Sequence, residues 1–212
     1  MKKYRLTGRT KKVDGVILHQ IEALKEFATY SGKVIVPGTL GGWIEKGFNL
    51  SQAGHSWVDD TSFVYGEAMV CDDAEVLNHS LVRDNAIVHH RATITNASKI
   101  YDRVDVGGDS VITGNIDIIG YAHISGDANV SDYSHYIVIG PIGYYKNILS
   151  AYITFYLTKN NEIAVNCDWF SGSIKDFVKE VKRKYNHIDY RAIKKQYLYA
   201  VKLAKKQIKT KE

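Results

Sequence analysis

Aliphatic side chains recur at every sixth residue over the middle of this chain. The series begins at Val58, ends at Val130, and each of its thirteen members is β-branched. A second series lies four residues after each aliphatic, and eleven of its thirteen members are Ala or Ser. A period of six residues held through thirteen units is an internal repeat, and it predicts a stacked repeat architecture.

Between these two series lies a third that favours tight corners. Two residues after each aliphatic stand Asp60, Gly66, Asp72, Asn78, Asp84, His90, Asn96, Asp102, Gly108, Gly114, Gly120, Gly126 and Asp132. Gly, Asn and Asp tolerate the positive φ of a tight turn. Three six-residue units then make one triangular coil of eighteen residues, and stacked coils pair strand on strand at about 4.8 Å. The pattern predicts a mainly β protein containing a left-handed parallel β-helix of about four to five coils.

The flanking segments predict two further parts, so we expect a β cap over residues 1–42, the β-helix over 43–135 and a small α/β domain over 136–212. Residues 3–6, 16–21 and 34–36 have strand patterns. An open end of a β-helix exposes unpaired backbone and apolar core, which requires a cap. We expect four apolar residues to cover that end: Trp43, Ile44, Leu50 and Trp57.

The last part of the chain predicts strands followed by two helices. Residues 136–139 form a strand, and residues 151–157 and 162–166 form a hairpin across 159–161. Ser173 is a good N-cap for a helix near 174–186. Asp189 is the expected cap of a second helix near 190–208, whose buried face is predicted to consist of Ile193, Tyr197, Ala200, Val201 and Ala204.

Charge is unevenly distributed along the chain. Residues 41–135 carry 5 basic and 14 acidic side chains, whereas residues 175–212 carry 13 basic and 4 acidic ones. The basic residues fall on the polar faces of the expected helices, so we expect a solvated face and not a nucleic-acid surface. No signal peptide or membrane span is apparent, and Cys71 and Cys167 are expected to be free thiols in the reducing cytoplasm.

Catalytic chemistry is weakly indicated. Because imidazole in general titrates near neutrality, the available general bases are His89, His90 and His123, with His89 and His123 the choices for a transferase. No loop interrupts residues 58–135 to enclose an active site. Cys167 is expected to be a buried strand residue, and no His, Cys or carboxylate cluster has metal-ligand spacing, so neither a metal nor a cofactor is predicted.

A binding site is predicted just after the repeat. Glycines bring backbone N–H groups close to an anion, aromatic rings stack on bases, and a lysine meets a phosphate. The alternative is that the aromatic residues belong to the core and the glycines only make turns. The candidate ligand-binding residues are Gly140, Gly143, Tyr144, Tyr145, Lys146, Trp169 and Phe170.

Parts of the sequence resemble a family of uncharacterised hexapeptide-repeat proteins. The resemblance is carried by residues 40–45, 49–51 and 57–58, and by residues 139–143 and 167–172 of the C-terminal part. That family is common in bacteriophages and gut bacteria, and some members are labelled putative transferases. Where a second cysteine is expected two residues after Cys167, this chain has Trp169, which argues against a paired-thiol role.

The resemblance implies an oligomer, with a homotrimer expected first and a dimer second. Residues eighteen apart stack on one face of the prism, and an apolar patch usually marks a contact surface. The candidate interface residues are Phe63, Tyr65, Leu81, Tyr101 and Ile119.

The resulting functional expectation is a non-catalytic, oligomeric binding protein, phage-encoded and located in the host cytoplasm. By analogy it would sequester a small anionic, nucleotide-type signal or block a host defence protein. Two alternatives stay open: an acyltransferase with an interface histidine, and a structural or assembly scaffold.

Overall fold

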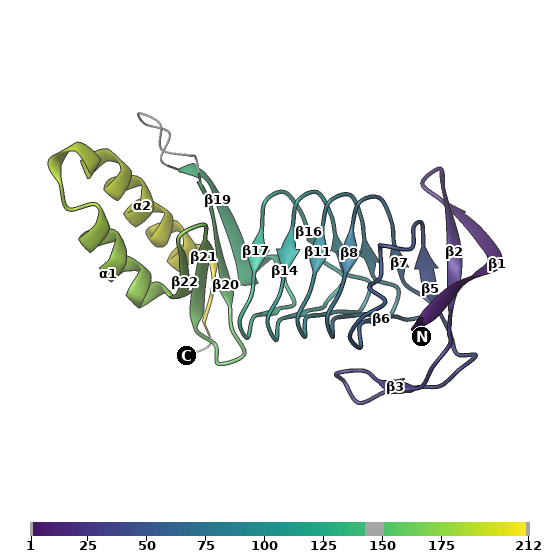
Figure 1. Cartoon of the computed structure of the whole chain (residues 1–212). Coiled ribbons are helices and arrows are strands. Elements are labelled where there is room, and N and C mark those ends of the chain that lie inside the picture. The colour runs from purple at the N-terminus through teal and green to yellow at the C-terminus, as the bar shows by residue number, and fades with distance from the viewer. Residues whose placement is uncertain (1, 143–150, 211–212) are drawn as a thin grey trace.

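Residues eighteen apart in the repeat pair with each other as neighbouring parallel strands, as in the series Val64, Val82, Ile100 and Ile118. The computed structural model describes residues 2–142 and 151–210. Figure 1 shows a prism of stacked coils with a β-hairpin at one end and a sheet with two helices at the other. The expected fold class, a left-handed parallel β-helix with an N-terminal β cap and a C-terminal part ending in two helices, is confirmed.

Short strands form the three faces of the prism. The first, which we call the hairpin face, consists of β5 (Leu40–Ile44), β7 (Phe63–Val64), β10 (Leu81–Val82), β13 (Lys99–Ile100) and β16 (Asp117–Ile118). The second, the histidine face, consists of β8 (Met69–Val70), β11 (Ile87–Val88), β14 (Asp105–Val106) and β17 (His123–Ile124). The third face consists of β6 (Trp57–Val58), β9 (Glu75–Val76), β12 (Thr93–Ile94), β15 (Val111–Ile112) and β18 (Asn129–Val130).

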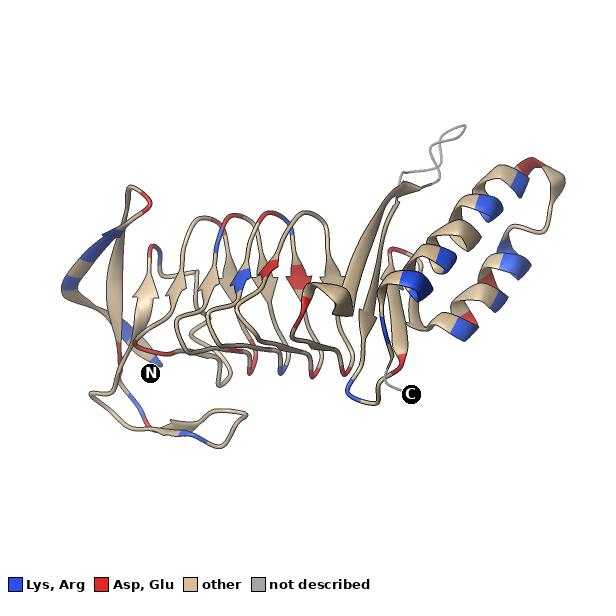
Figure 2. Ribbon diagram, turned by 180° about the vertical axis from the view of Figure 1, so that it is seen from behind, with Lys and Arg blue, Asp and Glu red and all other residues tan. Residues whose placement is uncertain are grey.

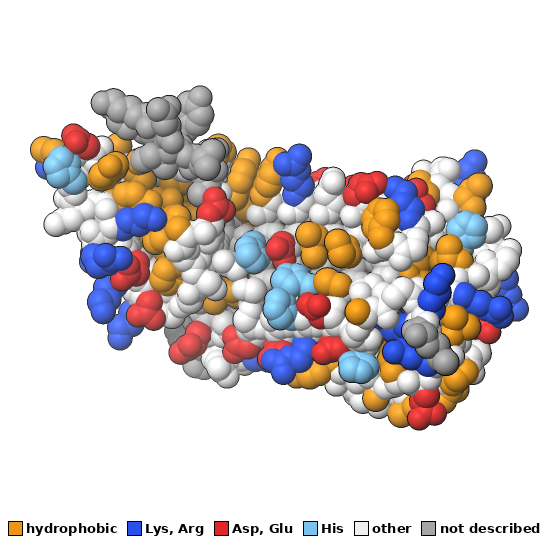
Figure 3. All heavy atoms as spheres, in the orientation of Figure 1, with side chains coloured by type: hydrophobic (Ala, Val, Ile, Leu, Met, Phe, Trp, Pro, Cys, Tyr) orange, Lys and Arg blue, Asp and Glu red, His pale blue; other side chains and the backbone are white. Residues whose placement is uncertain are grey.

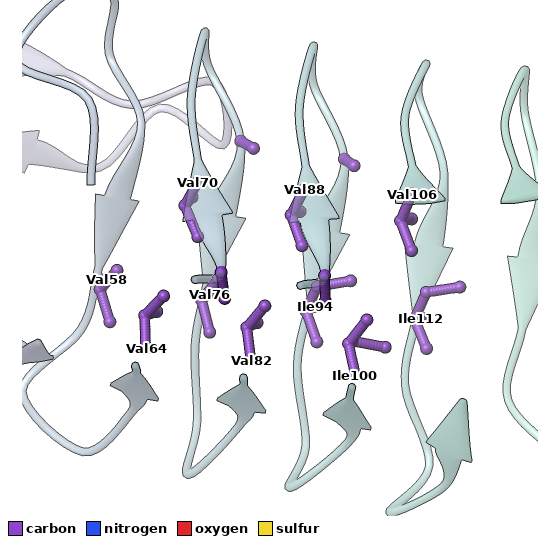
Figure 4. Packing of buried hydrophobic residues seen from close by; sticks show 14 of the residues in the cluster. Val58, Val64, Val70, Val76, Val82, Val88, Ile94, Ile100, Val106 and Ile112 are labelled. Atoms are coloured by element: carbon purple, nitrogen blue, oxygen red, sulfur yellow. The ribbon is translucent and has the colours of Figure 1, made fainter. Parts of the chain in front are cut away.

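The core of the prism is a set of aliphatic ladders (Figure 4). The six-residue series from Val58 to Val130 is fully buried. A β-branched residue suits this position because its side chain is stiff and packs well against a pleated surface. Burying one Val or Ile side chain contributes roughly 1.5–3 kcal/mol, so the ladders are the main source of stability in the described prism.

The prism starts two inward positions earlier than the repeat does. Ile44 pairs with Val64 and Leu50 with Val70, both at a separation of twenty residues instead of eighteen. The first coil therefore carries two extra residues, and the strict period hides it. Ile44 and Leu50 are the first layer of the core, not a cover over its end, which corrects our expectation for them.

The two tryptophans lie on the outside of this first coil. Trp57 is buried because the ring of Phe27 packs edge-on against it at 5.6 Å. Trp43 is half-buried and lies beside Phe63 under the ammonium of Lys11. Neither ring therefore covers the end of the prism as expected.

An antiparallel hairpin closes the N-terminal end of the prism. It consists of β1 (Tyr4–Val13) and β2 (Val16–Ala23), and β2 pairs with β5. Tyr4 and Ile21 are buried in the same cluster as the ladders, and the Tyr4 hydroxyl donates to the carbonyl of Leu50 at 2.6 Å. A smaller pair, β3 (Phe27–Ala28) with β4 (Val34–Ile35), follows the hairpin.

A buried lysine joins the hairpin to the first coil. The Lys3 ammonium donates to the carbonyls of Ala53 and Ser56, at 3.3 and 2.8 Å, and to the Ser56 hydroxyl at 3.0 Å. Burial, with a smaller contribution from nearby Lys25, lowers the pKa of Lys3 to about 8. The contact fixes the corner that holds the two extra residues.

An antiparallel four-stranded sheet closes the other end. Its order is β19 (Tyr136–Ile142), β20 (Ala151–Leu157), β21 (Ile163–Cys167) and β22 (Phe170–Ser173), preceded by a 3-10 turn, η1 (Tyr133–His135). Successive side chains of a strand point to opposite faces of a sheet. Accordingly Tyr156 and Ala164 pack against the last coil, whereas Phe155 and Val165 pack against the helices.

Two helices cover the outer face of this sheet. Helix α1 (Ile174–Lys184) begins after Ser173, whose hydroxyl accepts from the backbone N–H of Asp176, as expected. Helix α2 (Arg191–Gln207) buries the five residues predicted from its sequence. The expected cap was wrong: Asp189 lies within a 3-10 turn, η2 (Ile188–Tyr190), and Tyr190 precedes the helix without a side-chain cap.

The charge asymmetry of the sequence maps onto separate parts of the fold. Figure 2 shows basic residues along the outer sides of α1 and α2 and acidic residues along the corners of the prism.

Among the described residues, neither helix is long and apolar enough to cross a membrane.

Two glycines that occupy the same corner of successive coils give a test of the coil spacing. Gly108 and Gly126 have φ of +67° and +66°, but a Cβ on Gly108 would lie 2.5 Å from the backbone N of Gly126, whereas one on Gly126 meets nothing within 4 Å. Gly126→Ala should cost about 1–2 kcal/mol for its backbone conformation alone. Gly108→Ala should cost about 1–3 kcal/mol more, because the coils must move apart. Urea unfolding of both variants measures the difference, and equal losses would contradict this spacing.

Lys3 should make stability depend on pH in the alkaline range. Unfolded Lys3 keeps its proton up to about 10.5, whereas the folded protein releases it near 8. The unfolded state therefore binds more protons between these values, and the free energy of unfolding should rise with pH there. We expect this rise between pH 8 and about pH 9.5 in the wild type, and its absence in Lys3→Met, in urea unfolding at matched ionic strength. Parallel pH profiles for the two proteins would refute the assignment to Lys3.

Candidate functional site

A cleft lies where the last two coils meet the C-terminal sheet. Its volume is about 520 Å³. Two hydrogen bonds hold the sheet against the histidine face here: the backbone N–H of His123 donates to the Thr154 hydroxyl, and the Asn166 amide donates to the Ser125 hydroxyl, both at 2.8 Å. The lining residues are Arg103, Asp105, Tyr121, Ala122, His123, Tyr152, Cys167 and Asp168.

One wall of the cleft is aromatic. The rings of Tyr121 and Tyr152 stack with their centroids 4.4 Å apart and only 9° between their planes. Tyr121 follows a corner of the last coil and is 46% exposed, while Tyr152 comes from β20. The stacked pair therefore exists only because the sheet docks on the prism.

A cation lies next to the aromatic wall. The guanidinium of Arg103 is 5.7 Å from the centre of the Tyr121 ring, and Arg103 lies one coil before Tyr121. Within the described part of the chain, no carboxylate forms an ion pair with Arg103. Arg103 and Tyr121 also line a second hollow, of about 550 Å³, that runs along the acidic corners of the prism. These two residues are shared by both hollows.

The other wall belongs to a cluster of histidines and carboxylates on the histidine face (Figure 3). Asp105 lies between His89 and His123. One oxygen of its carboxylate is 2.7 Å from His89 Nε2, and the other is 4.0 Å from His123 Nε2. The two histidines that we singled out for a transferase are thus brought to a single carboxylate.

The pairing changes the protonation of both partners. The hydrogen bond to Asp105 raises the pKa of His89, in spite of its partial burial. Partial burial alone would raise the pKa of Asp105, but the hydrogen bond from His89 and the neighbouring His123 outweigh it, so that pKa is lowered. Asp105 is therefore an ionised acceptor that holds the Nε2 proton of His89.

A third histidine completes the cluster. His90 Nδ1 lies 2.6 Å from His89 Nδ1, and its backbone N–H donates to Asp72 Oδ2 at 2.9 Å. Asp72 and His90 occupy the same corner of successive coils, each with φ of 57°. One ligand atom from each of Asp72, His89 and His90 lies within 4.8 Å of the others. The expectation that no such cluster has metal-ligand spacing was therefore wrong, because the eighteen-residue coil supplies the spacing.

The ligand-binding residues predicted from the sequence do not form one site. Gly140 is exposed in β19, and Phe170 begins β22. These strands are opposite edges of the four-stranded sheet, so the two positions are separated by three strand spacings of about 4.8 Å. The remaining loop candidates lie outside the described residues: Gly143, Tyr144, Tyr145 and Lys146.

Trp169 and Phe170 belong to the core of the C-terminal part. Both pack against the helix-facing cluster, and the Trp169 indole N–H donates to the Tyr197 hydroxyl at 3.1 Å. The Lys184 ammonium lies 4.1 Å from the Trp169 ring and covers it. The alternative weighed for these two residues, a structural role, is the one that the packing supports. Cys167 is buried as expected, and burial raises the pKa of its thiol.

The candidate interface residues differ in how accessible they are. Tyr65 is only 5% exposed. It lies against the turn of the N-terminal hairpin, where its hydroxyl donates to Asp14 at 2.7 Å. Phe63 is half-buried under Lys11. These two residues are already covered by the chain's own hairpin, which corrects the expectation that they form an open patch.

The other three interface candidates stay at least partly accessible. Leu81 and Tyr101 are half-buried, and Ile119 is 49% exposed. The Tyr101 hydroxyl donates to Asp117, and the Arg83 guanidinium lies over its ring. Self-association through this face stays a prediction.

The residues that sequence reasoning missed could have been found by counting in steps of eighteen. Asp105 is eighteen residues before His123, and Asp72 is eighteen before His90. Arg103 and Tyr121 are related in the same way. Tyr152 has no such signal, because its place depends on how the C-terminal sheet docks.

The comparisons with known proteins add no assignment. No protein-family model matches the chain, and the search of curated proteins finds no match. The resemblance to the hexapeptide-repeat family therefore stays a prediction.

Proposed function

We propose that this protein binds and sequesters a small anionic ligand of nucleotide type, without turning it over, in the cleft between the prism and the C-terminal sheet. The observation that carries the proposal is the meeting of Arg103 with the stacked rings of Tyr121 and Tyr152. Sequestration of a host signal by a phage-encoded protein is the setting in which such binding would act.

Each part of a nucleotide has a counterpart in this cleft. A base stacks on an aromatic side chain, and such stacking is tolerant of the base because every base has a π-face. The guanidinium of Arg103 matches a phosphate through two parallel hydrogen bonds. The exposed carboxylate of Asp168 accepts from a ribose hydroxyl or an exocyclic amine.

Arg103 supplies a cation for an anionic ligand. The Asp105 carboxylate is engaged by His89 at 2.7 Å. Arg103 has no such partner among the described residues. A volume of about 520 Å³ lies within the usual range for small-molecule sites, about 300–1,000 Å³.

A ligand screen with matched arginine variants tests the proposal. Thermal-shift measurements with linear, cyclic and dinucleotide phosphates, in EDTA, should identify a ligand that raises the melting temperature. Stacking of one base is worth about 1–3 kcal/mol, so Tyr121→Ala should weaken binding by roughly 5- to 150-fold in calorimetry. Arg103→Ala should weaken it about tenfold or more, because it removes a charged hydrogen bond.

Arg91→Ala is the matched control. Arg91 is also an arginine of the repeat, paired with Asp109 and outside the cleft lining, so its removal should leave affinity unchanged. Failure of the whole panel to bind, equal affinity in Arg103→Ala and Arg91→Ala, or chemical conversion of the ligand would each rule the proposal out.

Acyl transfer is a second candidate, favoured by one specific observation. A histidine hydrogen-bonded to a carboxylate, as His89 is to Asp105, is the arrangement that orients a general base. His123 lies on the other side of the same carboxylate and also lines the cleft.

Acyl transfer makes its own kinetic prediction. An acyl-coenzyme thioester should be consumed in the presence of an amine or hydroxyl acceptor. Release of the free thiol measures this consumption. A positioned base contributes typically 10²–10⁴-fold, so His89→Ala, which removes the base held by Asp105, should lower kcat by about that factor. His79→Ala, at an exposed corner outside the cluster, should not change kcat. Thiol release no faster than without protein would eliminate this candidate.

A further inference from the structure

Two corner residues and the residue that follows β11 direct their ligand atoms at a common point on the histidine face. The atoms belong to Asp72, His89 and His90, and they lie within 4.8 Å of one another. Asp72 and His90 are exposed and His89 is half-buried, so the point is open to solvent. Imidazole and carboxylate are both ligands of first-row divalent metals.

The Asp105 carboxylate orients the His89 ring for a ligand. It lies 2.7 Å from Nε2, the nitrogen that donates to it in the neutral imidazole. In the neutral imidazole the lone pair is then on Nδ1, the atom that faces His90. A carboxylate that holds one ring nitrogen while the other binds the ion is a recurrent feature of protein metal sites.

The next coil along the prism leaves room for this orientation of the His89 ring. Gly107 lies one coil after His89, and a Cβ there would come within 2.6 Å of His89 Nε2. The absence of a side chain at Gly107 lets the His89 ring lie over the backbone and reach Asp105.

Two nitrogens on one tetrahedral zinc ion, each about 2.0–2.1 Å from the metal, lie about 3.3 Å apart. The two Nδ1 atoms are 2.6 Å apart. The backbone of both residues is held by the coil. A small rotation of the exposed His90 ring moves its Nδ1 away from His89 Nδ1 to the separation found on zinc.

We infer that Asp72, His89 and His90 form a binding site for one divalent first-row transition metal of the Zn²⁺ class, with Asp105 positioning His89. Three protein ligands leave the fourth position of a tetrahedral ion to water or to a ligand atom. The site adjoins the cleft through Asp105 but shares none of its three metal ligands with the cleft lining. The inference does not rest on the proposed function. Nucleotide binding is tested in EDTA, which removes the metal, so the two experiments can fail independently.

Metal titration of the tag-free, EDTA-stripped protein tests the inference. Zn²⁺ should bind with a stoichiometry of one per chain, measured by competition with a chromophoric chelator, and Co²⁺ should give the visible spectrum of a tetrahedral nitrogen–oxygen site. His90→Ala and His89→Ala should each lower the affinity at least about tenfold. Asp105→Ala should lower it about 10- to 100-fold while leaving the stoichiometry at one, because that residue acts through His89.

His79→Ala is the matched control for His90→Ala. Both histidines are exposed corner residues at positive φ, 64° and 57°, and Ala97, one coil after His79, has φ of 61°, so the fold accepts alanine at the corner position of His79. His79→Ala should bind Zn²⁺ as the wild type does.

Three results would overturn the inference. One is the absence of Zn²⁺ and Co²⁺ binding, and another is equal affinity in His90→Ala and His79→Ala. The third is a thiolate charge-transfer band in the Co²⁺ spectrum, which would place the ion on Cys71 or Cys167 instead. Circular dichroism of each variant confirms that lost binding is not lost folding.

Discussion

The register between successive coils is the constraint on which the rest of this structure depends. Each short strand donates and accepts backbone hydrogen bonds only with the coil on either side, as between the N–H of Ile87 and the carbonyl of Val104. A shift by one residue would turn every inward aliphatic outward, so the buried ladders and the backbone pairing enforce the same register. The eighteen-residue step is therefore fixed throughout the regular coils.

A fixed register turns sequence separation into spatial columns. His89, Gly107 and Asp105 illustrate the effect, because the ring of one coil lies over the glycine of the next and reaches the carboxylate beside it. The corner carboxylates act in the same way along the prism: Asp72 accepts from the backbone of His90, and Asp102 from that of Gly120. Functional side chains on such a scaffold are positioned by backbone pairing, and they need no helix or loop.

The two ends of the prism are closed by different means. At the first coil, the hairpin continues the backbone pairing of β5 and adds the buried ammonium of Lys3. At the last coil, a sheet presents one face to the prism, with Tyr156 packed on the ladders and Thr154 accepting from His123. A cleft forms at this second closure, where the sheet brings Tyr152 of β20 against Tyr121.

The sequence by itself determined the coil, its faces and its buried ladders, because one six-residue period encodes inward, outward and corner positions at once. It also determined the buried side of α2, where helical periodicity is strong. The six-residue period did not reveal the whole first coil, since two extra residues between Leu50 and Trp57 break it. The pairing of Leu50 with Val70 nevertheless continues. The tertiary structure alone decided the cleft, because the stacking of Tyr121 on Tyr152 depends on how a separate sheet docks and not on any repeat. The histidine cluster lies between these cases: its residues are related by the eighteen-residue step, but the 2.7 Å contact of His89 with Asp105 depends on side-chain orientations that a period does not encode.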